Sequence, residues 1–471
     1  MAVTLVCGAS VFTACSNDDD KNESKTDEGG KNRQEFVSHT RSNLKTMAEN
    51  MNFGSWEAAN TINQYFNQYV LNNPEFEKAV MPLFLQSVLR NVKPVEEGSE
   101  LAEKGYTSYA TVDLTTFNYR FTMKDDNSGF DVEPAEDFEM ILNSYNPQTM
   151  KLENGNFKLT LKAGGKTYKR FMERFSSDQM AVLVLIPEDF VFAISDKISG
   201  SWREIYSGAF KNESKISDTS KIIFNQDERF SVSGTITSSI PDAPEMGKKA
   251  DATTINFSLD SDRKNHKGVV FVGFEHNGQK MVELSLNETG KGTGGLRNID
   301  LSKFTTTSSI IDVLVAIWNG RDIDEAKLTL FDDMTTTFSV SDMNKLVELN
   351  DEMATARRNY ADEATIDGYT QQMNKLMTGS ITCKGVSQTI PMKLQTVKFG
   401  VDYTPMLSFK FADEKDYVAL SDMLDRDSEI YLINILDHAM DPMAESFITV
   451  RQLIQFVQNI QGLFGQSESI D

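Results

Sequence analysis

Between about residues 34 and 92, apolar residues recur every three or four positions, which is the spacing of an amphipathic helix. The pattern breaks at Gly54-Ser55 and at Asn73-Pro74, where a flexible glycine, a capping serine and a proline favour helix ends. This segment is therefore predicted to form three short antiparallel helices. The apolar positions that define the pattern include Leu44, Met47, Met51, Ile62, Tyr65, Phe66, Tyr69, Val70, Phe76, Val80, Leu83, Phe84 and Val88.

From about Tyr106 onward the apolar period changes from 3.6 to 2, which is the period of a strand with one buried face. Asn277-Gly278 stands between two alternating runs and is the strongest hairpin signal in the chain. Segment 105–290 is therefore predicted to be antiparallel and β-rich. The alternating apolar positions include Phe117, Tyr119, Phe121, Met123, Val270, Val272, Phe274, Val282, Leu284 and Leu286.

Glycine and proline mark the expected strand ends within the β-rich segment. Asn154-Gly155 predicts a turn, and Gly164-Gly165 is expected to end the strand that follows it. The nearly continuous apolar run 180–186 predicts a buried strand, which Pro187 is expected to stop because proline has no N–H for the ladder.

The second half of the chain mixes both periods. Strands are predicted around Leu328 and Phe338, and again at 392–401 and 407–411. Ser341-Asp342 can cap a long charged helix that runs toward Met377, with an interruption near 362–368. A further helix is expected to close the chain, with a stripe formed by Phe447, Val450, Leu453, Ile454, Val457, Ile460 and Leu463.

These elements predict an α+β fold with N-terminal short helices, an antiparallel β-rich middle and a mixed β/helix second half. We expect a helical segment at 33–95, a β-rich domain at 105–320 that ends in a helix, and a mixed helix/strand domain at 326–471. The closing helix of the middle domain would hold the apolar run 310–318, which is shorter than the roughly 18 residues of a membrane span.

The chain is strongly acidic, with a formal net charge of −22 and an isoelectric point near 4.7. Such a surface repels phosphate backbones and anionic headgroups, which argues against nucleic-acid binding and against a polybasic membrane patch. Hydrophobic residues make up 39% of the chain, which is enough for a sizeable core.

Residues 12–15 read Phe12-Thr13-Ala14-Cys15, and an uncharged, mostly apolar run precedes them. An apolar stretch that ends in small residues is typical of a secretion signal. With cysteine directly after the small pair, the pattern resembles the lipobox of bacterial lipoproteins. The resemblance implies a signal peptide at 1–14 that is cleaved after Ala14, and a Cys15 that is acylated and anchors the chain to a membrane.

The next five residues, Ser16-Asn17-Asp18-Asp19-Asp20, resemble the acidic export tag of Bacteroidota lipoproteins that face the cell exterior. The resemblance implies an outer-membrane location, with outer-membrane lipid as the partner of Cys15. Residues 15–32 are predicted to be a disordered acylated tether, because the polar stretch after Cys15 has no apolar residue to bury. Signal peptides usually begin with a basic region, so we expect the true start of translation to lie upstream of Met1.

Few residues of the body point to chemistry. Once Cys7 is removed and Cys15 is acylated, Cys383 has no internal disulfide partner, and its alternating surroundings predict a packed strand cysteine rather than a nucleophile. No pair of the four histidines lies at a sequence spacing typical of metal ligands. These histidines are His39, His266, His276 and His438.

Three acidic residues, Asp425, Asp427 and Glu429, alternate along the chain and are the weak candidates for a calcium site. An EF-hand is excluded because Ile430 and Leu436 stand where the motif requires glycine and glutamate. The glycine-rich run 290–295 fits a dinucleotide-binding pattern, but it follows a hairpin strand and opens no convincing helix. No cofactor and no dedicated metal site are therefore predicted.

The sequence favours a non-catalytic binding or scaffold module of unknown ligand. One alternative is a glycan- or nutrient-binding component of a surface uptake system, for which Trp202 is the weak candidate platform, because sugar rings stack on exposed aromatic side chains. The less favoured alternative is a carboxylate-based hydrolase, whose residues would be Asp437, His438 and Asp441. A protein ligand at the cell surface also fits the predicted location.

Overall fold

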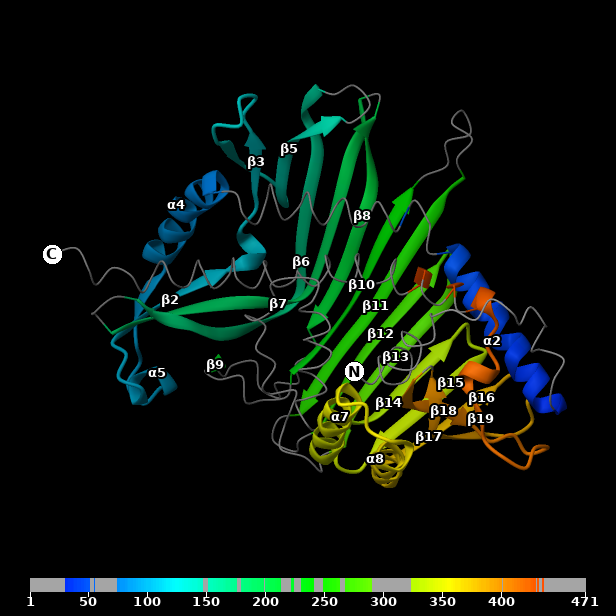
Figure 1. The fold of residues 1–471 in the computed structure, drawn as a ribbon. Helices are drawn as coiled ribbons and strands as arrows, with labels where there is room; N and C mark the ends of the chain where they lie inside the picture. The colour runs from blue at the N-terminus through cyan, green and yellow to red at the C-terminus, as the bar shows by residue number, and fades with distance from the viewer. Residues whose placement is uncertain are drawn as a thin grey trace. The chain divides into compact units, whose positions relative to one another are not determined.

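The computed structural model shows a β-rich α+β fold, which confirms the predicted fold class at this level (Figure 1). The chain divides into two compact units, one formed by residues 1–53 and 259–444 and the other by residues 54–258 and 445–471. The division falls within the predicted segments 33–95 and 105–320 rather than at their ends. The structure describes residues 30–50, 55, 74–146, 151–175, 179–198, 200–212, 222–223, 230–240, 249–262, 267–289, 323–399, 401–428, 430–431 and 434–435.

The first unit contains an antiparallel meander in which each strand pairs with the next along the chain. Such neighbours need only short connections or a local excursion, so the sheet follows the order of the sequence. Its strands are β12 (Lys267–His276), β13 (Gln279–Thr289), β14 (Ile323–Leu330), β15 (Met334–Val340), β16 (Met377–Cys383), β17 (Ile390–Phe399), β18 (Asp402–Phe409) and β19 (Val418–Ala419).

The hairpin predicted at Asn277-Gly278 is confirmed. β12 and β13 pair in antiparallel register on either side of these two residues. Both turn residues have positive φ angles, 50° for Asn277 and 78° for Gly278, as a type I′ turn requires. Asparagine and glycine tolerate this backbone conformation best, which is why the two-residue signal was strong.

Two helices, α7 (Met343–Arg358) and α8 (Glu363–Leu376), lie between β15 and β16 in the sequence and contact each other. The Asp342 carboxylate accepts a hydrogen bond from the Lys345 N–H and caps α7, as predicted. The interruption falls before Asp362 rather than through the following residues, because the Asp362 carboxylate caps a new helix at the Thr365 N–H. The helices bury Leu346, Leu349, Met353, Ile366 and Met373 in the core of this unit.

Helix α2 (Lys31–Asn50) packs on the same unit, although it comes from the other end of the chain (Figure 1). The Phe36 ring is 2% exposed and lies 5.1 Å from the Phe409 ring and 5.6 Å from the Phe411 ring, centroid to centroid. Nearer the helix C-terminus, Leu44 and Ala48 join a second apolar cluster with Leu424, Ile435 and their neighbours.

Polar contacts hold the start and the middle of α2 on the unit. The Gly30 N–H donates to Glu414 Oε1 at 3.0 Å, and the Arg33 guanidinium lies 3.6 Å from the same carboxylate. Further along, Arg41 forms an ion pair with Asp425. The helix is therefore held by the aromatic packing of Phe36 and by the ion pairs of Arg33 and Arg41, which flank Phe36 in the sequence.

The second unit contains longer strands and a more complicated order. Most pairs are antiparallel, but β2 with β7, β3 with β5 and β6 with β9 are parallel, so the predicted antiparallel pattern is wrong for these pairs. Its strands are β1 (Val92–Pro94), β2 (Ser108–Asp113), β3 (Tyr119–Met123), β4 (Phe130–Pro134), β5 (Phe138–Asn146), β6 (Lys151–Phe175), β7 (Met180–Ile198), β8 (Ser201–Asn212), β9 (Ile222–Ile223), β10 (Phe230–Ile240) and the first part of β11 (Asp251–Asp262).

The strand ends predicted from glycine and proline in this unit are wrong. β6 runs through Gly155 and Gly165, and both glycines have positive φ angles at places where the pairing register shifts. β7 likewise runs through Pro187, which faces Thr167 directly after the second shift. Glycine can adopt the positive φ that some β-bulges use, and the ladder is interrupted at a bulge, which makes proline tolerable next to it. These residues therefore lie at irregularities within long strands instead of ending them.

The described helical elements that accompany these strands are α4 (Pro74–Arg90), α5 (Glu100–Glu103) and the short 3₁₀ helix η3 (Leu114–Thr116). α4 packs Phe76 and Val80 into a core with Phe121 and Met140 from β3 and β5. The helices predicted around Leu44 and Phe76 are confirmed as α2 and α4, which belong to different units, and the predicted helix between them lies mostly outside the described residues. None of the described helices is long and apolar enough to cross a membrane.

Phe36→Ala is expected to lower the free energy of unfolding of the first unit by about 3–5 kcal/mol, because it removes a buried ring between two others. Hydrogen exchange of the α2 and β18 amides across a urea series measures the change. Val401→Ala, at a turn residue that is 82% exposed, is the control and should stay within about 0.5 kcal/mol. Equal protection in the Phe36 variant and the unsubstituted chain would contradict the packing described for α2.

Candidate functional site

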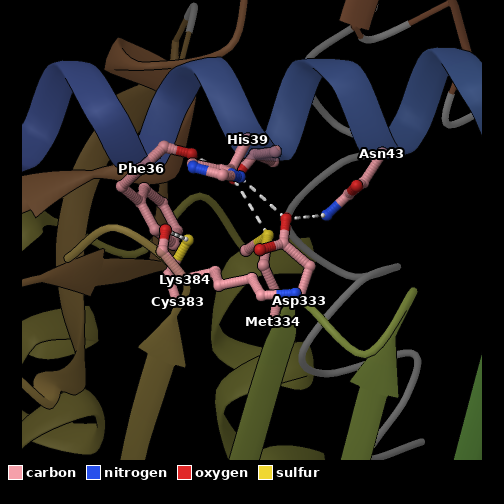
Figure 2. Close-up of polar contacts among 8 residues, drawn as sticks. Phe36, His39, Asn43, Asp333, Met334, Cys383 and Lys384 are labelled. Atoms are coloured by element: carbon pink, nitrogen blue, oxygen red, sulfur yellow. Dashed lines mark hydrogen bonds and ion pairs between the residues drawn. The ribbon is translucent and has the colours of Figure 1, made fainter.

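The most chemically varied side-chain cluster of the described residues lies in the first unit, where His39, Asp333 and Cys383 converge (Figure 2). Each side chain offers one potential metal-ligand atom, and these atoms all lie within 4.8 Å of one another. His39 and Asp333 are 294 positions apart in the sequence. Only the docking of α2 on the sheet brings the three residues together.

Each residue is positioned by a different element of the fold. His39 follows Phe36 by three positions on α2, so the buried ring orients the helix face that carries the imidazole. Asp333 belongs to the tight turn between β14 and β15, where Phe331 and Asp332 have φ angles of 54° and 53°. Cys383 is the last residue of β16 and pairs with Met334, directly beside that turn.

The Asp333 carboxylate is the centre of the polar contacts in Figure 2. His39 Nδ1 lies 2.8 Å from Asp333 Oδ2, and the Asn43 side-chain amide donates to the same oxygen at 3.1 Å. The other oxygen, Oδ1, is buried and has no hydrogen-bond partner within the described part of the chain. The backbone C=O of Asp333 accepts a hydrogen bond from the Lys384 N–H at 3.0 Å, which ties the turn to the end of β16.

Burial dominates the chemistry of Cys383. Its side chain belongs to the apolar core of this unit, and the residue is 6% exposed. Burial, together with the nearby carboxylates of Asp333 and Glu35, raises the pKa of the thiol to about 12. A thiol in this state is protonated at neutral pH and is a poor nucleophile, so the neighbouring imidazole does not make the cluster a cysteine-hydrolase pair.

Glycine at position 385 leaves room next to the cluster. Gly385 has a φ angle of +84°, and a Cβ built there would lie 3.4 Å from His39 Nε2 and 3.8 Å from Glu35 Oε2. Glu35 and His39 are four residues apart on α2, so both side chains reach the same turn from one helix face. The His39 side chain is 35% exposed and that of Asp333 is 13% exposed, so the cluster is reached from solvent along its imidazole side.

The alternating pattern around Cys383 predicts a buried strand residue, which the structure confirms, but nothing in the pattern connects Cys383 with His39 or Asp333. No local spacing relates residues from three distant segments. A weak signal existed in α2, where His39 and Asn43 interrupt the face that also carries Phe36 and Leu44. Polar groups on a buried helix face require partners, and these partners came from the sheet.

Trp202, the weak glycan-platform candidate, is half-buried near the start of β8. Two ammonium groups lie over its indole ring, those of Lys158 at 4.9 Å and Lys197 at 5.4 Å from the ring centroid. These cation–π contacts occupy the ring. A sugar that stacked on this face would have to displace a lysine.

The acidic candidates near residue 425 fall into different environments. Asp425 accepts a hydrogen bond from the Ser428 N–H at 2.9 Å through one carboxylate oxygen, and it pairs with Arg41 of α2 through the other. Asp427 is exposed, and the Glu429 side chain lies outside the described residues. The Asp425 carboxylate thus serves as a helix cap and as an anchor for α2.

Several predicted features lie outside the described residues: Ala14, Cys15 and the acidic run 16–20, the glycine-rich run 290–295, the apolar run 310–318, and the hydrolase candidates Asp437, His438 and Asp441.

No protein-family profile matches the chain, and no curated protein or solved structure resembles it significantly.

The buried thiol should react slowly. In a chain that carries Cys7→Ser and Cys15→Ser, Cys383 is the single thiol, and its reaction with a disulfide reagent at pH 8 is expected to be at least about 100-fold slower than in the urea-unfolded chain. Folding favours the protonated thiol of Cys383, because its pKa is higher in the folded chain than in the unfolded chain. The contribution of Cys383 to the free energy of unfolding is therefore complete below about pH 9 and is lost as the pH rises toward 12. Stopped-flow absorbance measures the rates, and equal rates would show that the thiol is not buried.

Proposed function

We propose that the chain is a lipid-anchored lipoprotein of the outer membrane that faces the cell exterior, with a body that acts as a non-catalytic binding or scaffold module. The observation that carries the proposal is the run from Phe12 to Asp20, in which a lipobox-like end with Cys15 is followed at once by an acidic export-like tag. The polar tether and the acidic composition agree with an extracellular position, because both favour hydration over contact with anionic lipid.

The arrangement of α2 supports a scaffold at the end of the tether. The helix begins at Lys31, at the end of the predicted tether, and is packed on the meander of the first unit. A pull on the tether would therefore act first on α2 and its contacts with Phe409 and Phe411, rather than on a loose loop. Such attachment suits a module that holds a ligand near the membrane.

The chemistry of the described residues favours binding over hydrolysis. In the cluster of His39, Asp333 and Cys383, the thiol has a raised pKa and the carboxylate is hydrogen-bonded to His39 and Asn43. The hydrogen bonds of this cluster fix the position of α2 on the sheet, and none of its groups is activated as a nucleophile. The glycan-binding alternative depends on Trp202, and the hydrolase alternative on Asp437, His438 and Asp441.

The anchor is tested by expressing the native chain and Cys15→Ala in a Bacteroidota host. Intact mass of the native protein is expected to show a chain that begins at Cys15 and carries a diacylglyceryl group, and protease added to whole cells should remove it. Cys15→Ala should lack the lipid mass and leave the membrane fraction. Cys7→Ala, a matched cysteine within the signal, should behave like the native chain; retention of residues 1–14 in the native protein would refute the anchor.

The ligand class is tested by screening the purified chain against a glycan array and chromogenic glycosides. A scaffold of the proposed kind gives neither glycan signal nor hydrolysis. Glycan binding that Trp202→Ala weakens at least about 10-fold would favour the nutrient-binding alternative. Tyr360→Ala, which removes an exposed aromatic side chain of the first unit, is the control and should leave such binding unchanged. Hydrolysis that His438→Ala abolishes would favour the enzyme.

A further inference from the structure

We propose that His39, Asp333 and Cys383 form a binding site for a divalent transition metal of borderline softness, with Zn²⁺ as the preferred ion. The inference goes beyond the proposed function and does not depend on the lipid anchor. It rests on the kinds of ligand atom that meet at this point and on one carboxylate oxygen that has no hydrogen-bond partner among the described residues.

The three side chains are the ligand types that zinc prefers. Zinc binds cysteine sulfur, histidine nitrogen and carboxylate oxygen, most often four at a time in a tetrahedron. A mixed sulfur and nitrogen set discriminates against Mg²⁺ and Ca²⁺, which prefer oxygen ligands only. Three protein ligands leave one position for water.

The distances require a small contraction. With bond lengths of about 2.0–2.3 Å, ligand atoms around a tetrahedral zinc lie about 3.3–3.8 Å apart. The three ligand atoms already lie within 4.8 Å of one another, so no pair has to contract by more than about 1.5 Å. The Asp333 ligand atom would be Oδ1, the oxygen without a partner, while Oδ2 keeps the Asn43 amide. His39 Nδ1 now lies 2.8 Å from Oδ2 and would give up that hydrogen bond as it turned to the metal.

The carboxylates at this point are only partly compensated, by His39 and Asn43 on Asp333 and by Lys31 on Glu35. Asp333 Oδ1 is buried and has no hydrogen-bond partner within the described residues, which is a costly state for a carboxylate oxygen. Glu35 adds a second carboxylate on the same side of α2, and it is close enough to Cys383 to disfavour the thiolate. A divalent cation at this point would satisfy the free oxygen and offset the repulsion between these groups.

Metal binding changes the proton balance in a defined way. The metal takes the place of the proton on Cys383 Sγ, and that proton passes to solvent. The imidazole binds as a neutral ligand through Nδ1, with its proton on Nε2, which faces the Gly385 turn beside Glu35. The Asn43 amide remains on the Asp333 carboxylate and orients it, as outer partners of metal ligands commonly do.

Occupancy would join three segments that are distant in the sequence. His39 comes from α2, Asp333 from the β14–β15 turn and Cys383 from the end of β16. The metal would therefore cross-link α2 to the meander. Because the ligands come together only in the folded unit, bound metal should stabilise that unit against unfolding.

The decisive experiment titrates the metal-free full chain, carrying Cys7→Ser and Cys15→Ser, with Zn²⁺ in competition with a chromophoric chelator. One equivalent is expected to bind. Cys383→Ala and His39→Gln should each weaken it at least about 30-fold, because each removes a ligand, whereas His276→Gln, at the β12–β13 hairpin, is the matched control and should leave it unchanged. Affinity that is equal in all four proteins would assign the binding to the acidic surface and overturn the proposal.

Co²⁺ gives a second readout that needs no comparison of stabilities. A cobalt ion bound by Cys383 should produce a thiolate-to-metal charge-transfer band together with the intense visible bands of tetrahedral coordination. Asp333→Asn, which keeps the size of the side chain, should shift the visible bands and weaken binding while the thiolate band persists. Weak octahedral bands without a thiolate band in the folded, unsubstituted site would refute the proposal, even where a cysteine variant failed to fold.

Discussion

The first unit depends on the packing of one N-terminal helix against a sheet built from the far end of the chain. Phe36 supplies the central contact, because its ring lies against those of Phe409 and Phe411 in a core that the meander alone would leave open. Once this ring is buried, the register of α2 is fixed. The fixed register then decides which polar side chains of the helix meet which parts of the sheet.

The polar contacts around that packing follow from the need to satisfy buried groups. Arg41 meets Asp425, and Asn43 and His39 meet Asp333, since a helix face that enters a core must bring partners for its polar atoms. One oxygen of Asp333 is still left without a partner within the described residues. A bound cation would satisfy this oxygen, with the imidazole and the buried thiol as its other ligands. The proposed metal site and the stability of this unit therefore depend on the same packing of α2.

The two units show how far local patterns can be trusted. Asn277-Gly278 predicted a hairpin correctly because both residues favour the backbone of a type I′ turn and the flanking strands pair across it. Asp342 and Asp362 likewise cap the helices that follow them. Gly155, Gly165 and Pro187 were misleading because the same conformational preferences serve a bulge in a long strand as well as a turn, and only the pairing partner selects between the two.

Elements with a local cause could be predicted from the order of residues alone: the periods of strands and helices, the capping residues, the tight hairpin, and the lipobox-like start from which the proposed location comes. The same holds for Cys383 as a buried strand residue. The folded structure was needed to show that α2 and α4 belong to different units and that His39, Asp333 and Cys383 meet. The physical reason is that contacts across 294 positions are fixed by the burial of Phe36 in a distant core, and no spacing along the chain records that event.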